Sequence, residues 1–323
     1  MSLTQYKEIY TPIYNDIVEI TKKHERAHWT ADEVKLQTDV EQWNANEISE
    51  DEKYVIKNIL RLFTQSDVNV GTGYIEKLIP YIKNNESRGM LISFCCREFE
   101  HQRAYALLSD TLGFGQDFYY EFLEYEDMKE KHEFMLEEIE DNHIGFTKYL
   151  SKQIIIEGVC LFASFAVLLN FDRRGKLPGM CDIVRWSMID ESLHIEGNTL
   201  LFKHFINENK SAFNKDVKQE IYDMAERIVS LEDLFIDRCF TINESIDLTK
   251  QEMKDYIRYV TNYRLKQLTL EPKWSTVKNP IPWIDYMMGS TFGNFFEREI
   301  VEYSKANLTG NFKKGYPDKD QKS

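Results

Sequence analysis

Residues 146–169 read FTKYLSKQIIIEGVCLFASFAVLL and form one of the most apolar stretches of the chain. Apolar residues recur along it at helical spacing and no proline interrupts it, which predicts a long helix buried in a core. Its one acidic residue is Glu157. An ionised carboxylate buried there without a partner would be costly, and a bound metal ion is one way to remove that cost. Two alternatives explain Glu157 without a metal. It could lie on a solvent-exposed edge of the helix, or it could pair with a buried arginine.

Helical patterns of the same kind continue on both sides of this stretch. A helix is predicted to start near Ser49, where Ser-Glu-Asp-Glu supplies a cap and first-turn acids, and to run toward Pro80. The chain has only 14 Gly and 7 Pro and little period-two alternation, so we expect an all-α fold of long helices with extra flanking helices. Further helices are predicted at about 86–112, 128–140 and 180–205. Two or three more follow after residue 205, with breaks at 248 and near 272–282.

Composition limits the class of protein. The net charge is −14, which argues against a nucleic-acid-binding groove. The five cysteines include no CxxC pair and indicate reduced thiols in a cytosolic protein. The first ten residues lack the apolar core of a signal peptide, and the apolar run 159–169 is too short to span a bilayer. We therefore expect a cytoplasmic protein that binds neither nucleic acid nor membrane, with one domain at 1–305 and a flexible tail at 306–323.

A short motif occurs twice on separate predicted helices. Glu98 and His101 are three residues apart, as are Glu191 and His194. Residues three apart share a helix face, so each pair can close on one metal ion. One such pair arises readily by chance in an acidic chain, and two are better evidence.

Asp67 and Glu157 complete the pattern. Alone, Asp67 would be read as one of the many solvated helix aspartates. Together the residues supply one carboxylate from each of two helices and a Glu-x-x-His pair from each of two others, which is the ligand set of di-iron and di-manganese bundles, with Asp in one Glu position. Four carboxylates balance two divalent ions, and oxygen ligands with two imidazoles suit iron or manganese. The predicted metal ligands are Asp67, Glu98, His101, Glu157, Glu191 and His194.

The order and spacing of these ligands resemble the small, radical-generating subunit of class I ribonucleotide reductase, a ferritin-like fold. Three further phrases resemble the family over residues 20–310, namely AspGluSerLeuHis at 190–194, AsnProIleProTrp at 279–283 and AsnPhePheGluArg at 294–298. The resemblance implies a homodimer that passes an oxidising equivalent to a separate large catalytic subunit, which makes deoxyribonucleotides for DNA replication. It implies a dinuclear Fe/Fe, Mn/Mn or mixed Mn/Fe centre, activated by dioxygen directly or with a flavodoxin-like partner. No nucleotide cofactor site is expected on this chain.

The same resemblance assigns three residues to radical chemistry. Tyr105 lies one turn after His101 and corresponds to the tyrosine that is oxidised to a stable radical; a core tyrosine is the alternative. Asp190 is expected to accept a hydrogen bond from His101 and so to orient that ring. Trp29 corresponds to the tryptophan that continues the path toward the surface, although by itself it reads as a packing residue.

Two departures from the family pattern bear on these roles. Leu161 stands where the family often has Phe, which leaves open whether the oxidising equivalent resides on Tyr105 or on the metals. The tail lacks the acidic, aromatic-ended peptide that usually docks the large subunit, and Tyr316 is a candidate relay tyrosine in it.

Three other functions compete with this interpretation. A ligand-binding di-metal oxidase of the same superfamily would need a long apolar channel to the metals. A ferritin-like metal store would need a symmetric cage of shorter chains. A purely structural helical protein would leave Glu157 unexplained.

Overall fold

A computed structural model describes residues 2–138, 140–240, 247–276 and 278–289. Within these ranges the regular structure is helical and contains no strand, so the all-α prediction is confirmed. The predicted tail at 306–323, Tyr316 and the phrase at 294–298 lie outside the described residues.

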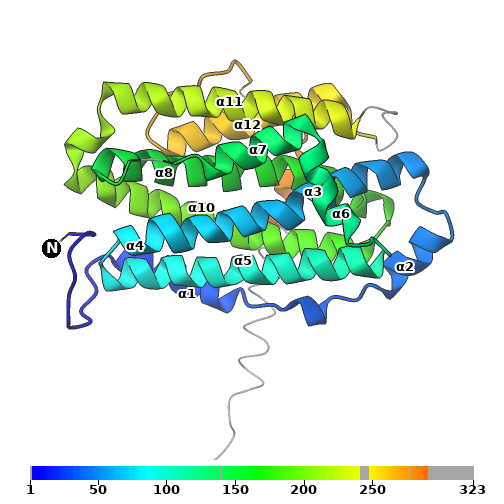
Figure 1. The fold of residues 1–323 in the computed structure, drawn as a ribbon, viewed down its shortest axis with the longest axis horizontal. Coiled ribbons are helices and arrows are strands. Elements are labelled where there is room, and N and C mark those ends of the chain that lie inside the picture. The colour runs from blue at the N-terminus through cyan, green and yellow to red at the C-terminus, as the bar shows by residue number, and fades with distance from the viewer. Residues whose placement is uncertain (1, 139, 241–246, 277, 290–323) are drawn as a thin grey trace, which may run out of the picture.

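Four long helical segments form the centre of the bundle (Figure 1). They are α3 (Glu50–Gly73), α5 (Asn85–Thr111), the continuous run of α8 (His143–Ile155), η4 (Ile156–Leu161) and α9 (Phe162–Leu169), and α10 (Pro178–Glu208). α3 lies along α5, while α10 contacts both α5 and the α8–α9 run. Each of the four segments carries at least one predicted metal ligand, so the packing brings all of them toward one interior.

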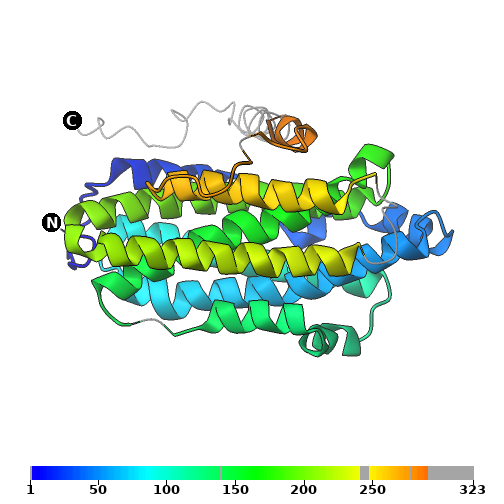
Figure 2. The same ribbon diagram turned by 90° about the horizontal axis from the view of Figure 1, so that it is seen from above.

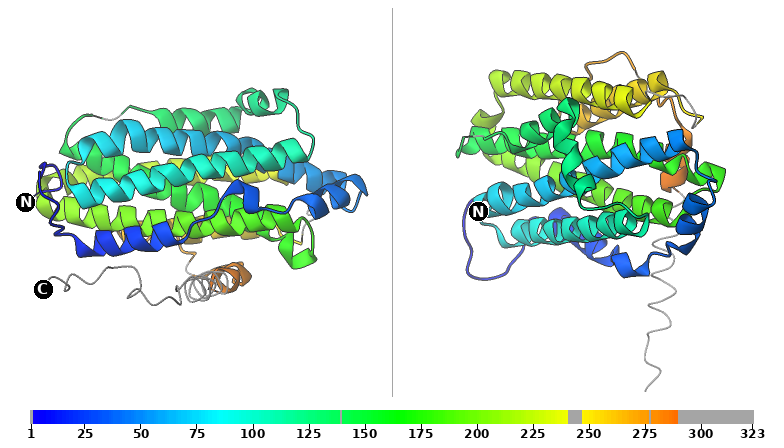
Figure 3. Two further views of the ribbon diagram at one scale, coloured as in Figure 1. Left: turned by 90° about the horizontal axis from the view of Figure 1, so that it is seen from below. Right: turned by 45° about the vertical axis from the view of Figure 1, so that its right-hand side comes forward.

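Flanking helices cover this centre on two sides. α1 (Asn15–Arg26) packs against α5 and α10 and is seen from below in Figure 3. α11 (Lys215–Cys239) and α12 (Lys250–Gln267) lie over the side of the α8–α9 run, as Figure 2 shows from above. The remaining elements are η1 (Ala31–Glu33), α2 (Gln37–Asn44), η2 (Tyr74–Leu78), α4 (Ile79–Tyr81), α6 (Asp117–Tyr120), η3 (Glu121–Glu124), α7 (Glu126–Leu136), η5 (Asp172–Arg174) and η6 (Lys210–Phe213).

Helix starts follow from local capping chemistry. Ser49 accepts a hydrogen bond from the backbone N–H of Glu52, whose carboxylate accepts one in return from the backbone N–H of Ser49. α10 is capped from outside, because the Asp39 carboxylate accepts from the N–H groups of Gly179 (2.8 Å) and Met180 (2.7 Å). α2, which carries Asp39, therefore holds the start of the helix that bears two predicted ligands.

The apolar stretch is the buried core of the bundle. The helix at 143–174 is long and apolar enough to cross a membrane, and its most apolar window is 100% buried by the surrounding chain. The sequence analysis predicted the helix itself over 146–169, close to the observed run His143–Leu169, and weighed only the uninterrupted apolar residues 159–169 as a possible membrane span. Burial on all sides is what a central bundle helix requires.

The stretch also contains a feature that the sequence pattern did not predict. Residues Ile156–Leu161 form a π-helical segment, in which the backbone hydrogen bonds span one extra residue. The carbonyl of Gly158 accepts a hydrogen bond from Nε of Arg264 in α12 (3.1 Å). A Cβ atom at position 158 would lie 2.3 Å from that nitrogen, so the close approach requires glycine. Glu157 is the second residue of this π-helical segment.

Lys152 is buried in the same run of helix without an ion-pair partner among the described residues. Its side chain is 2% exposed, and its Nζ lies 4.7 Å from the centre of the Phe134 ring and makes no hydrogen bond. Burial lowers the pKa of Lys152 from 10.5 to about 8. At neutral pH the ammonium is therefore charged in a site that disfavours charge.

We expect Lys152→Met to raise the free energy of unfolding at pH 7 by about 1–3 kcal/mol, because a tenfold loss of proton affinity on burial corresponds to about 1.4 kcal/mol. Between pH 8 and 10.5 the folded protein has released this proton while the unfolded chain still holds it, so wild-type stability rises with pH there. The variant should lose that rise. Urea unfolding at pH 7 and pH 10 measures both effects.

Lys148→Met is the matched control, because Lys148 lies one turn earlier on α8 and pairs with Glu220 at 2.9 Å. It should bring no gain in stability. A Lys152→Met protein that is less stable than wild type at pH 7 would contradict the prediction.

Candidate metal centre

The structure brings the six predicted metal ligands to one place in the interior. Asp67 comes from α3, the Glu98 and His101 pair from α5, Glu157 from η4, and the Glu191 and His194 pair from α10. Each of the six is 2% exposed or less. The site is therefore closed to bulk water, and its charges must be balanced from within.

Two glutamates lie between the two histidines. Glu98 is 3.0 Å from Nδ1 of His194 and 3.5 Å from Nδ1 of His101. Glu191 is 3.3 Å from Nδ1 of His101 and 3.4 Å from Nδ1 of His194. Both rings thus present the same nitrogen, Nδ1, to the carboxylates at the centre of the site.

The ligand atoms fall into two groups of the size that one ion requires. One group contains Glu98, Glu157, Glu191 and His194, and the other contains Asp67, Glu98 and His101, with the atoms of each group within 4.8 Å of one another. Glu98 belongs to both groups. A carboxylate shared in this way can bridge two ions, so the arrangement is compatible with a dinuclear centre.

Unpaired polar atoms test whether the residues fit metal ions. Buried polar groups normally have hydrogen-bond partners. Here both carboxylate oxygens of Glu98 and of Glu191, one oxygen of Asp67 and Nδ1 of His194 are buried without a hydrogen bond. All of them face the same interior, and all are atom types that bind iron or manganese. The unpaired donor atoms therefore fit a pair of iron or manganese ions.

The electrostatics lead to the same conclusion. Burial raises the pKa of Glu157 to about 8, with a further contribution from the charge of Glu191. Burial also raises the pKa of Asp67 well above its ordinary value. Glu157 and Asp67 therefore favour their neutral forms in so dry a site unless positive charge lies nearby. Two divalent cations would supply the matching charge.

Glu157 is held by three neighbours that the sequence analysis did not identify. The Tyr74 hydroxyl donates to Oε1 of Glu157 (2.8 Å), and the Gln153 amide donates to the same oxygen (2.7 Å). Asn198 donates to Oε2 of Glu157 (3.3 Å) and to the Tyr74 hydroxyl (2.8 Å). Gln153 was detectable in principle, because it lies four residues before Glu157 on the same helix face. Tyr74 and Asn198 come from other helices.

A hydrogen-bonded chain leads away from His101, as expected from the resemblance. Nε2 of His101 is 3.1 Å from Oδ2 of Asp190, and the same oxygen accepts a hydrogen bond from Nε1 of Trp29 (2.7 Å). Arg97, which the sequence analysis did not identify, supports the chain: it lies 3.5 Å from Asp190 and donates to the carbonyl of Trp29 (2.9 Å). Trp29 also contacts the half-buried Trp186, at 5.3 Å between ring centres.

Tyr105 is buried beside the carboxylates that are predicted to bind metal. Its hydroxyl is 3.3 Å from Oγ of Ser187, and its ring packs against Phe63 at 4.9 Å between ring centres. Burial, followed by the charge of Asp67, raises the pKa of Tyr105 well above its ordinary value. The phenol is therefore protonated at neutral pH and enclosed in the core of the bundle.

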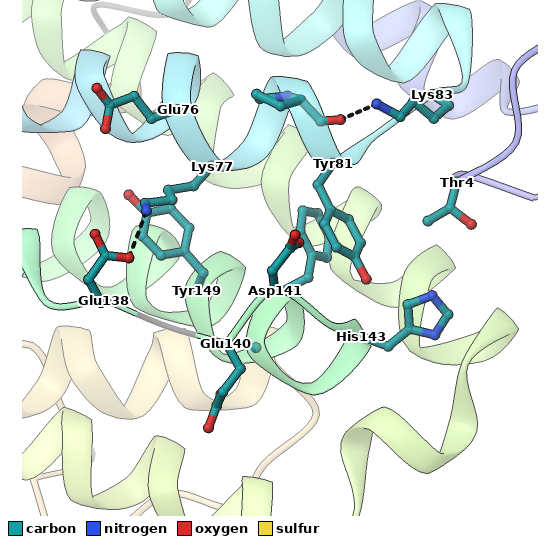
Figure 4. Close-up of a pocket in the computed structure, with 13 residues that line it drawn as sticks. Thr4, Glu76, Lys77, Tyr81, Lys83, Glu138, Glu140, Asp141, His143 and Tyr149 are labelled. Carbon is teal, nitrogen blue, oxygen red and sulfur yellow. Dashed lines mark hydrogen bonds and ion pairs between the residues drawn. The ribbon is translucent and has the colours of Figure 1, made fainter.

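A surface hollow of about 560 Å³ lies at one end of the bundle and contains none of the six ligands (Figure 4). Charged side chains of both signs line it, and Lys77 forms an ion pair with Glu138 at 3.0 Å. Tyr149 forms part of its wall, one turn before Gln153.

Comparisons with known proteins agree with this geometry. The family profile described as "Ribonucleotide reductase, small chain" matches residues 7–280. A probable ribonucleoside-diphosphate reductase small subunit of Invertebrate iridescent virus 3 is 40% identical over 309 residues, covering 90% of this chain and 82% of the relative. The ribonucleotide reductase R2 subunit of Clostridium botulinum has the same fold, with a TM-score of 0.82 at 20% identity, covering 89% of this chain and 94% of that one. The dimanganese(II) NrdF of Streptococcus sanguinis gives a TM-score of 0.70 at 17% identity, covering 86% and 98%.

Proposed function

The chain belongs to the ribonucleotide reductase small-chain family and is the small subunit of a ribonucleoside-diphosphate reductase, and we propose that its six clustered ligands hold the dinuclear centre from which the oxidising equivalent for that reaction arises. The observation that carries the proposal is the pair of ligand groups that share Glu98. The reaction needs a large catalytic subunit as partner. The fold is the ferritin-like bundle that the sequence predicted.

The protein's own residues hold and surround the metals. Asp67, Glu98 and His101 would bind one ion, and Glu157, Glu191 and His194 the other, with Glu98 between them. When bound and oxidised, the metals supply a strong one-electron oxidant. Iron and manganese both suit this donor set, and a dimanganese relative supports manganese as one of the options.

Two further roles belong to other residues. Tyr105 stores the oxidising equivalent, and the hydrogen-bonded chain from His101 through Asp190 to Trp29 transfers it. Tyr105 suits storage because it is buried, protonated and close to Asp67. Asp190 accepts hydrogen bonds from both His101 and Trp29 and so links the centre to the indole. Trp29 passes the equivalent toward the large subunit. These contacts and the family resemblance support the assignment.

Two further partners are proposed, a second copy of this chain and a flavodoxin-like activator. The chain would form a homodimer, for which exposed apolar side chains on η2 and α5, such as Ile75, Ile92 and Phe99, offer a surface. Its mass in solution tests this. A flavodoxin-like protein would assist activation if manganese is the metal. The complex would work in the cytoplasm, without nucleic acid or membrane.

One experiment tests the function directly. Metal-free protein is titrated with Fe²⁺ or Mn²⁺ under anaerobic conditions, activated, and mixed with its large subunit and a ribonucleoside diphosphate. We expect two ions per chain and formation of the deoxyribonucleotide. Two bound ions with no nucleotide reduction, together with oxidation of an apolar small molecule at the site, would instead establish the ligand-binding oxidase.

A further inference from the structure

The two histidines of the centre have different partners on their outer sides. The outer nitrogen of His101 faces the carboxylate of Asp190, which is the usual kind of partner for a metal-binding histidine. The outer nitrogen of His194, Nε2, lies 3.1 Å from Nε2 of His24 in α1. A second imidazole in this place is neither a carboxylate, a backbone carbonyl nor water, which are the common partners.

The positions of the protons in this contact follow from the geometry. Nδ1 of His194 faces Glu98 and Glu191, so a metal ion there takes the lone pair of Nδ1 and leaves the ring proton on Nε2. That N–H then donates to Nε2 of His24. His24 must carry its own proton on Nδ1, and this nitrogen lies 2.8 Å from Oγ of Ser93. With the His194 proton on Nε2, a proton on Nε2 of His24 would leave two N–H groups facing each other.

Packing holds His24 in this orientation. The side chain is 1% exposed, and its ring lies 4.9 Å from the ring of Phe94 and 4.9 Å from that of His194, centre to centre. α1, which carries His24, packs against the two helices that bear the Glu-x-x-His pairs (Figure 3). The ring therefore has one fixed position from which to meet His194.

His24 also separates His194 from the surface. A surface hollow of about 470 Å³ is lined by His24 and Ser93, together with His28 and Cys96. His194 does not line this hollow, although its Nε2 is one hydrogen bond away from a residue that does. Truncation of His24 would extend the hollow toward the outer nitrogen of a metal ligand.

We propose that His24 is the positioning residue of His194: it accepts the Nε2–H of that ring, and so keeps Nδ1 free and aimed at the metal site. This inference rests on the proposed metal-binding function. It predicts that the ion served by His194 depends on His24, whereas the ion served by His101 depends on Asp190. The two metal positions then differ in the hydrogen-bond acceptor of their histidine ligand. His194 donates to the neutral imidazole of His24, whereas His101 donates to the carboxylate of Asp190.

The test measures Mn²⁺ binding to the full-length chain by titration calorimetry and by electron paramagnetic resonance. Wild type should bind two ions and show the signal of a coupled manganese pair. His24→Ala should weaken one of the two ions by about 10- to 100-fold, which is the usual effect of losing such a partner. At manganese concentrations that fill the tighter position, the coupled signal should be replaced by that of a single ion.

Two rescues separate positioning from simple packing. His24→Gln retains an oxygen that can accept from His194 and an amide that can donate to Ser93, so it should restore tight binding of both ions. Imidazole added to His24→Ala should enter the enlarged hollow and restore the coupled signal. The control is His28→Ala, which alters the same hollow without touching a ligand and should bind manganese as wild type does, with or without imidazole.

The outcomes are distinct. If His24→Ala binds both ions with wild-type affinity, or if the Gln variant is as weak as the Ala variant, His24 has no positioning role. If wild type itself binds no manganese or iron pair, the proposed function fails first, and the His24 variants are not the cause.

Discussion

Replacing Glu98 with Ala should abolish the dinuclear centre and with it all activity of the subunit. Glu98 is the one ligand that belongs to both groups of metal-binding atoms, and it lies within 3.5 Å of Nδ1 of both histidines. Loss of a supporting residue outside the ligands already costs about 10- to 100-fold in metal affinity, so loss of a shared ligand should cost more than about 100-fold at each position. Titration with Fe²⁺ or Mn²⁺ measures this directly.

Thermal unfolding provides a second readout that does not depend on activity. Ions that bind only the folded state raise the melting temperature of wild type, whereas the Glu98→Ala protein should melt at the same temperature with and without metal. Glu100→Gln is the matched control, because Glu100 lies on the same helix but contacts Ala31 and Arg103 instead of the centre. A Glu98→Ala protein that still binds two ions tightly would remove Glu98 from the bridging position.

The clustering of the six predicted ligands could be foreseen because the signal in the sequence is local. A Glu-x-x-His pair lies on one helix face wherever that helix packs, and a lone carboxylate in the stretch 146–169 calls for a partner. Helix bounds followed from caps in the same way. The helix predicted at 86–112 is observed at Asn85–Thr111, where Asn84 accepts a hydrogen bond from the N–H of Ser87.

The support around the ligands was not predictable, because it depends on contacts between distant segments. His24 meets His194 across 170 positions of sequence, and neither residue lies in a pattern that points to the other. The π-helical segment that bears Glu157 is stabilised by Arg264, which is 106 positions away from its acceptor carbonyl. A π-helix and an α-helix share the same apolar periodicity over so short a length, so only the tertiary contact distinguishes them.

The paired variants Tyr105→Phe and Trp29→Phe should separate storage of the oxidising equivalent from its transfer. Tyr105→Phe removes the phenol, so the tyrosyl signal in electron paramagnetic resonance and the nucleotide reduction should both disappear while two metal ions remain bound. Trp29→Phe should leave the tyrosyl signal intact, because Tyr105 does not contact Trp29 in any described hydrogen bond or ring contact. Nucleotide reduction by this variant should nevertheless be lost.

The size of the Trp29 effect follows from what the indole contributes. Its N–H donates to the buried carboxylate of Asp190 at 2.7 Å. A hydrogen bond to a charged group contributes about 1.5–3 kcal/mol, which corresponds to about a 10- to 100-fold change in rate. Phenylalanine removes this bond and the readily oxidised ring together, so turnover should fall at least that far. Trp186→Phe is the control, since Trp186 contacts Trp29 but not Asp190, and it should retain the Asp190 link.

These two variants also decide whether the oxidising equivalent resides on Tyr105 or on the metals. The presence of Leu161 where the family often has Phe leaves that question open. If Tyr105→Phe keeps full nucleotide reduction, the equivalent is held on the metals and Tyr105 is a core residue whose hydroxyl faces Ser187. Trp29→Phe should be inactive in either case, because the contact from His101 through Asp190 to Trp29 starts at a predicted metal ligand and does not pass through Tyr105. Activity in Trp29→Phe would therefore refute the transfer path itself, whatever the result with Tyr105.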